Sequence, residues 1–149
     1  MKRLILTLIM ALLMGSALWA QEDIFEKFAD RKGVTTVYIS KKMFSMMNGY
    51  NNGSINLNNI GSKISGLQIL SCEDKTVIPE IRKEAARIKT DGYEVLMRIK
   101  EEGEHVTIYT KEGKEENQYI LLADEPQEFT IIMLNGKLTL EELQGTIKR

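Results

Sequence analysis

Apolar residues along this chain follow the period of a helix in some stretches and the period of a strand in others. Ile24, Phe25 and Phe28 recur at helical spacing and predict a short amphipathic helix within residues 22–31. The β-branched and aromatic run at residues 34–39 predicts the first strand. The chain therefore opens its folded part with a helix followed by a strand.

A methionine-rich helix is predicted next, over residues 41–47. Ser40 is a favoured N-cap residue at its start. The bulky side chains of this helix are Met43, Phe44, Met46 and Met47. Helical spacing favours packing in the core, and the two alternatives are an adaptable surface that binds a partner and thioether ligation of copper(I). We retain these four residues as a candidate partner face.

The middle of the chain predicts a second short helix and a buried strand. Leu57, Ile60 and Ile64 lie at helical spacing, and Gly66 is expected to close that helix. Residues 67–72 are mostly apolar and predict a buried strand. The preceding loop, residues 48–54, is rich in Asn and Gly, which tolerate turn geometries.

The longest predicted helix follows and ends at Gly92. Asp74 and Thr76 are candidate caps, and Pro79 suits a first-turn position. An apolar stripe runs along the helix, formed by Ile78, Ile81, Ala85 and Ile88. This stripe is the surface that we expect to lie on the core.

From residue 93 the apolar period changes to two, which is the period of a strand. Four strands are predicted, at residues 93–100, 105–110, 118–123 and 128–134. The segments between them have the composition and length of hairpin turns, so an antiparallel meander is expected. Thr139 and Glu142 then form a capping box that opens a final helix.

These elements define the expected fold class. Hairpin strands grouped apart from the helices indicate an α+β domain with two layers. We expect a mainly antiparallel sheet of about six strands, including the carboxyl-terminal four-strand meander, with the helices packed on one face. One such domain would occupy residues 21–149.

The amino terminus has the three parts of a secretory signal. Lys2 and Arg3 precede an apolar run at residues 4–14, and small residues follow. The run is too short to span a membrane, which needs roughly 20 apolar residues. Cleavage is expected after Ala20, with Ala17 as the alternative site, so residues 1–20 are predicted to be a signal peptide.

Cys72 is the only cysteine of the chain. A lipoprotein signal needs a cysteine directly after the cleavage site, so no lipid anchor is expected. A single cysteine also cannot form a disulfide within the chain. We predict an exported protein, periplasmic or secreted, with no stable membrane anchor after signal cleavage, whose stability comes from its packed core.

Composition and charge bear on the class of partner. Apolar residues make up 43% and charged residues 28% of the 149, the balance of an ordinary globular protein. Loss of Lys2 and Arg3 with the signal leaves 18 basic against 21 acidic residues, a net charge of −3. The basic residues are interspersed with acidic ones, so no nucleic-acid partner is predicted.

Candidate catalytic residues are few. His105, the only histidine, opens a predicted strand and is interpreted as a half-exposed strand-end residue. Cys72 is interpreted as a buried structural residue, the alternative being an intermolecular disulfide or oxidation. The sequence has no phosphate-binding loop, nucleophile elbow or metalloprotease motif, so we predict no catalytic residues, no cofactor and no metal site.

Four segments carry a family resemblance. They are VYISKKMF at residues 37–44, LQILSC at 67–72, GYEVLM at 92–97 and LLADEP at 121–126. In this order they resemble a family of small exported bacterial proteins that consist of a domain of unknown function. The resemblance covers nearly the whole mature chain and implies a shared fold, but no activity, cofactor or functional residue.

Two classes of function are therefore expected, and a third is kept. The first is a noncatalytic domain that binds a partner of the cell envelope, an exported protein or a surface component, through a sheet face or the methionine-rich helix. The alternative is a small-ligand-binding or sensory module with a pocket between the sheet and the helices. The third is a hydrolytic or redox enzyme without a recognisable motif.

Overall fold

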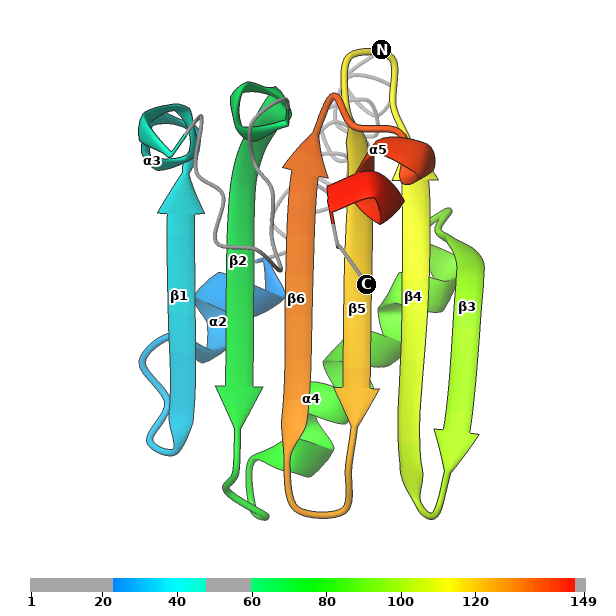
Figure 1. The fold of residues 1–149 in the computed structure, drawn as a ribbon. Helices are drawn as coiled ribbons and strands as arrows, with labels where there is room; N and C mark the ends of the chain where they lie inside the picture. The colour runs from blue at the N-terminus through cyan, green and yellow to red at the C-terminus, as the bar shows by residue number, and fades with distance from the viewer. Residues whose placement is uncertain (1–22, 48–59, 147–149) are drawn as a thin grey trace, which may run out of the picture.

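The computed structural model describes residues 23–47 and 60–146, and its centre is a six-stranded antiparallel sheet in the order β1-β2-β6-β5-β4-β3 (Figure 1). The strands are β1 (Val34–Ser40), β2 (Ile64–Cys72), β3 (Glu94–Glu101), β4 (Glu104–Glu112), β5 (Asn117–Asp124) and β6 (Phe129–Gly136). All six lie within three residues of the predicted boundaries. The expected α+β fold is confirmed.

The helices are short. They are α2 (Ile24–Phe28), α3 (Lys41–Met46), α4 (Ile78–Ala85) and α5 (Leu140–Thr146), with 3-10 turns η1 (Gly61–Lys63) and η2 (Ala86–Thr90). Ser40 caps α3 as predicted, because its hydroxyl accepts a hydrogen bond of 3.3 Å from the Met43 amide. No helix in this described part of the chain is long and apolar enough to cross a membrane.

The predicted meander is confirmed, since β3, β4, β5 and β6 follow one another in the sheet. The earlier strands extend it on the β6 side: β2 pairs with β6, and β1 forms the outer edge. β1 and β3 are therefore the two edge strands.

The helix predicted from Leu57, Ile60 and Ile64 is wrong for the part that the structure describes. Only a three-residue turn, η1, forms, and β2 begins at Ile64 and runs through Gly66. Gly66 pairs with Ser40 of β1 and Asn135 of β6. Pairing on both sides of the strand outweighs a weak helical pattern. Leu57, the loop at 48–54 and the expected signal peptide lie outside the described residues.

The main core lies between the sheet and α4, which runs obliquely behind the strands in Figure 1. The predicted stripe of Ile78, Ile81, Ala85 and Ile88 is buried there. It packs with Phe25 and Phe28 of α2 against the sheet residues Leu70, Ile120 and Ile131. The predicted long helix is thus confirmed in position, although its last turn is the 3-10 turn η2.

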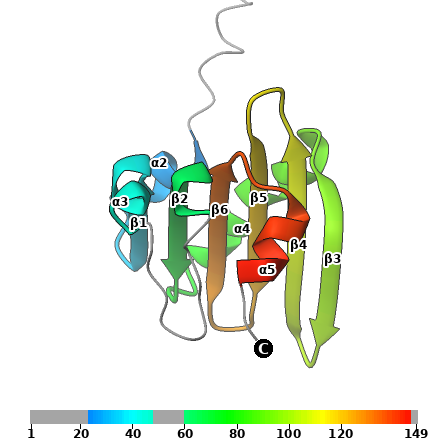
Figure 2. The ribbon, with the colours of Figure 1, turned by 45° about the horizontal axis from the view of Figure 1, so that its top comes forward.

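A second, smaller core lies at the other face of the sheet, beneath α5, which Figures 1 and 2 show on the near side of the strands. Its buried residues are Phe44, Ile60, Ile64, Tyr119 and Leu138, and Leu143 of α5 packs on them. The predicted capping box forms: Glu142 accepts from the Thr139 amide at 3.1 Å, and Thr139 accepts from the Glu142 amide at 3.3 Å. The helices α2 and α4 share one face as expected, but α5 lies on the opposite face, so the expectation that the helices pack on one face is wrong for α5, because its Leu143 packs on the second core.

Candidate functional site

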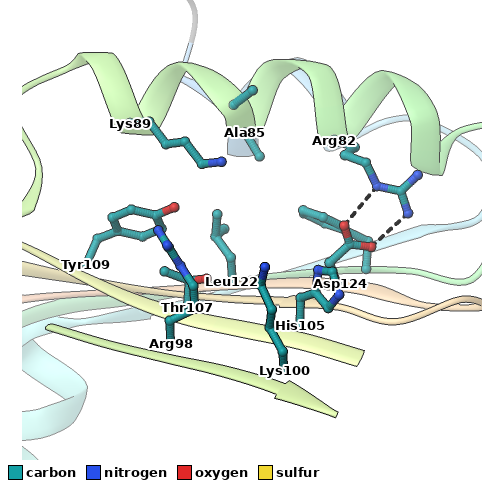
Figure 3. Close-up of a pocket in the computed structure, with 12 residues that line it drawn as sticks. Arg82, Ala85, Lys89, Arg98, Lys100, His105, Thr107, Tyr109, Leu122 and Asp124 are labelled. Atoms are coloured by element: carbon teal, nitrogen blue, oxygen red, sulfur yellow. Dashed lines mark hydrogen bonds and ion pairs between the residues drawn. The ribbon is translucent and has the colours of Figure 1, made fainter. Parts of the chain in front are cut away.

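A cleft of about 360 Å³ opens between α4–η2 and the strands β3, β4 and β5 (Figure 3). Its lining residues are Arg82, Ala85, Ala86, Lys89, Arg98, Lys100, His105, Thr107, Tyr109, Leu122, Asp124 and Phe129. The volume falls in the range of small-molecule sites, about 300–1,000 Å³. The position, between sheet and helices, is where the sequence placed a candidate ligand pocket.

The helix contributes Arg82 and Lys89 to one side of the cleft. Arg82 lies on α4 and Lys89 on the 3-10 turn η2 that continues it, and both side chains line the cleft from one flank of the helical segment. The buried stripe that includes Ile81 and Ala85 packs the helix on the sheet, and this packing determines which flank faces the cleft. Figure 3 shows both basic side chains extending from the helix toward the strands.

The edge hairpin contributes the opposite side. Arg98 and Lys100 alternate along β3 and therefore share one face of the sheet. In the β3–β4 register Arg98 faces Thr107 and Lys100 faces His105, which places all four on the helical face. Figure 3 shows Arg98, Lys100 and His105 rising from the strands into the space below the helix.

The base of the cleft is largely apolar. Tyr109 and Phe129 are each 2% exposed and belong to the main core. Leu122 packs against the same core, and Ala85 closes the base from the helix. The cleft therefore combines a buried, largely apolar base with basic side chains around it.

Asp124 is the one carboxylate among the lining residues, and it is neutralised by Arg82. The guanidinium donates from Nε to Oδ2 at 2.9 Å and from Nη2 to Oδ1 at 2.7 Å. The hydrogen bond to Asp124 raises the pKa of Arg82. Among the described residues, Lys89, Arg98 and Lys100 have no ion-pair partner.

Arg98 and Lys100 stand on the same face of β3, so their positive charges add to the electrostatic potential at the cleft. Some basic residues elsewhere in the fold are paired: Lys27 meets Glu84 at 2.6 Å, and Arg31 meets Glu80 at 2.7 Å.

The residues singled out from the sequence lie in separate places. His105 lines the cleft at the start of β4 and is exposed. Cys72 is 1% exposed, and its thiol donates to the Asp74 carbonyl at 3.7 Å, so its interpretation as a buried residue is confirmed.

The four residues of the candidate partner face are divided by the structure. Phe44 is buried in the second core, and Met47 is half-buried against it. Met43 and Met46 are 50% and 75% exposed. Only these two methionines remain available on the surface of α3.

The alternation of basic residues on one predicted strand was a sequence signal for the cleft, but the overall charge composition did not reveal it. In the sequence the basic residues were treated together, as interspersed with acidic ones, and Arg98 and Lys100 were not singled out. Their alternation on one strand and the short turn to His105 already put three basic groups on one face. Which face α4 covers could not be known from a single strand pattern.

Comparison with known proteins identifies the chain by family only. A family model described as "Domain of unknown function (DUF4252)" matches residues 26–146. Neither the curated proteins nor the solved structures contain a match. Within the described residues, no group of three or more His, Cys, Asp or Glu is arranged to hold a metal ion.

Proposed function

The chain belongs to the DUF4252 family of domains of unknown function, and from its cleft we propose that it is a noncatalytic domain that binds a small anionic ligand. The ligand would carry carboxylate or phosphate groups. The observation that supports this is the convergence of Lys89, Arg98 and Lys100 from a helix and an edge strand on one cleft (Figure 3).

Charge complementarity argues for the anion. Three cations without an ion partner among the described residues create a positive potential at the cleft, and a bound anion would relieve their mutual repulsion. Arg98 can bind a carboxylate or phosphate through two parallel hydrogen bonds, and the lysines add point charges. Binding of an anion would therefore lower the electrostatic energy of the three neighbouring cations.

The base of the cleft adds a second requirement. Leu122, Phe129 and Tyr109 offer apolar surface directly beneath the cations. A ligand with an anionic group and an apolar part would use both surfaces, whereas a purely apolar ligand would leave the cations desolvated and unpaired. This favours an anionic ligand over a purely apolar one.

Calorimetric titration with simple probes tests the proposal. We expect inorganic pyrophosphate and citrate to bind, and choline, a cation, not to bind. Arg98→Gln and Lys100→Gln should each weaken binding by about tenfold, because a hydrogen bond to a charged group contributes about 1.5–3 kcal/mol. Lys83→Gln is the matched control, since Lys83 is exposed on α4 but does not line the cleft.

The same titration can refute the proposal. If neither anion binds at low ionic strength, or if Lys83→Gln weakens binding as much as Arg98→Gln, the cleft is not an anion site. A hydrolysed or otherwise altered probe would instead make the domain an enzyme, contrary to the noncatalytic part of the proposal.

A second candidate is docking of a cell-envelope partner on α3. Its support is the exposure of Met43 and Met46, at 50% and 75%, on a helix anchored by the buried Phe44. Unbranched thioether side chains suit adaptable recognition. Crosslinking in envelope extracts, compared between the unchanged protein and a Met43→Gln, Met46→Gln variant, should lose the partner in the variant.

Export is part of the proposal and rests on Lys2, Arg3 and the apolar run at 4–14. The expected mature chain begins at Gln21 and is periplasmic or secreted. Intact mass of the protein isolated from the cell envelope fraction tests it. A mass that includes residues 1–20 would contradict signal cleavage.

A further inference from the structure

His105 stands between a cation and an anion on the strand side of the cleft. The register pairs it with Lys100 of β3 on one side and with Asp124 of β5 on the other. Residues paired directly across antiparallel strands share one face of the sheet, and all three side chains line the cleft beneath the helix. Figure 3 shows the imidazole beside Lys100 and Asp124 at the same end of the cleft.

The charged groups that face His105 come from three elements. Lys100 lies on β3, Asp124 on β5 and Arg82 on α4, and the last two form the ion pair described above. Glu104, the preceding residue of β4, alternates to the opposite face of the sheet. Among the described residues, the imidazole has no hydrogen-bond or ion-pair partner. Because both carboxylate oxygens of Asp124 accept from Arg82, a positive charge on His105 adds to the potential of the cleft.

Histidine is the only residue type in the lining whose charge ordinarily changes between about pH 5 and pH 8. Aspartate titrates below this range, and lysine, arginine and tyrosine titrate above it. The cleft therefore has two charge states that differ by the proton on His105. The protonated state adds a fourth cation to Lys89, Arg98 and Lys100.

We propose that His105 is a ligand-binding residue of the anion site, and that its protonation strengthens anion binding as the pH falls from about 8 to about 5.5. This inference rests on the proposed function, because it requires an anion in the cleft. A protonated imidazole donates from both ring nitrogens and carries a full charge, so it holds carboxylate or phosphate oxygens more strongly than the neutral ring does. The coupling is reciprocal: a bound anion favours the protonated ring.

The effect should be moderate because His105 is exposed. Water and salt screen charges at exposed positions. Coupling between two binding events in proteins usually changes affinity by about 5- to 150-fold. We therefore expect a change of about fivefold at low ionic strength, at the lower end of this range.

Calorimetric titration with pyrophosphate, at about pH 8 and about pH 5.5, compares the unchanged protein with His105→Gln and His105→Lys. Every comparison is made at one pH, so the titration of pyrophosphate itself cancels. At the higher pH His105→Gln should match the unchanged protein, and His105→Lys should bind about fivefold more tightly. At the lower pH His105→Gln should bind about fivefold more weakly, and His105→Lys should match the unchanged protein. Lys83→Gln, outside the cleft, should match the unchanged protein at both.

A second measurement needs no variant. His105 is the only histidine of the chain, so the untagged protein gives one set of imidazole resonances in an NMR titration. Saturating pyrophosphate should raise the pH midpoint of that titration by about 0.7 pH units, because a fivefold change in affinity and this shift express the same coupling.

The outcomes separate this inference from the proposed function. If pyrophosphate binds but His105→Gln weakens it equally at both pH values, or at neither, the pH-dependent role of His105 is wrong while the anion site stands. A midpoint that pyrophosphate does not move would also overturn that role. If the unchanged protein binds no anion at either pH, the proposed function itself fails.

Discussion

Arg82 of α4 and Asp124 at the end of β5 form a two-pronged ion pair, at 2.9 and 2.7 Å, that joins the helix to the sheet at one end of the cleft (Figure 3). The side chains of the pair are 48% and 30% exposed, so the pair adds less than about 1 kcal/mol to stability. Its larger effect is electrostatic. Asp124 is the only carboxylate that lines the cleft, and because Arg82 neutralises it, it does not cancel the positive charge of the other lining residues.

We predict that Asp124→Asn increases the affinity for pyrophosphate. The amide cannot neutralise the guanidinium, so Arg82 becomes available to the ligand and the cleft gains one positive charge. The gain should be about threefold or more at low ionic strength and should fade as salt screens the charges. Calorimetric titration at two salt concentrations measures it. An unchanged or lower affinity would contradict the assigned role of the pair.

The sequence predicted the strands well because those after residue 93 carry a two-residue period, and the two earlier ones are a β-branched run and an apolar run. Tyr119 and Ile120 show why that period is informative: adjacent on β5, they point to opposite faces and enter different cores. Turn composition then gave the meander order directly. The pairing of β2 with β6 was not predictable, because it joins segments that lie far apart in the chain.

The candidate site was less predictable than the fold. Lys89 and Lys100 come from elements whose relative placement depends on how α4 crosses the sheet, and no local pattern encodes that crossing. His105 was noticed, but only as an isolated residue. The common face of Val37 and Met97 was also not predictable, because it follows only from the register of all six strands.

Ile81 tests the predicted core stripe. It is 0% exposed beneath α4, and we expect Ile81→Ala to lower the free energy of unfolding by about 2–5 kcal/mol, from lost burial and the remaining cavity. Lys83→Ala, on the exposed side of the same helix, should change it by no more than about 0.5 kcal/mol. Urea unfolding measures both. A small effect at Ile81 would mean that α4 does not pack on the sheet as described.

Gly33 is required by its backbone conformation. Its φ is +84°, and an added Cβ would lie 2.6 Å from Cβ of Asp74. Gly33→Ala should therefore lower the melting temperature and cost about 1–3 kcal/mol. Gly66→Ala is the matched control: an added Cβ there meets the Tyr38 ring at an ordinary 3.6 Å. Equal effects of the two substitutions would contradict this explanation.

Tyr119 gives the fold a predictable response to alkaline pH. Burial raises the pKa of its phenol, whose hydroxyl donates to the Leu138 carbonyl at 2.7 Å. Because the folded-state pKa lies above the unfolded value of about 10, folding favours the neutral phenol. This stabilisation is complete below the unfolded pKa and is lost as the pH rises through the folded-state pKa.

Tyr119→Phe should therefore reduce the loss of unfolding free energy above about pH 10. Some loss should remain, because burial also raises the pKa of Tyr93. At neutral pH the variant should be less stable by about 0.5–1.5 kcal/mol, since it lacks the hydrogen bond to Leu138. Denaturant unfolding at several pH values measures both effects. Tyr38→Phe, at a phenol that is 66% exposed, serves as the control, and an alkaline loss identical in Tyr119→Phe and the unchanged protein would disprove the role of Tyr119.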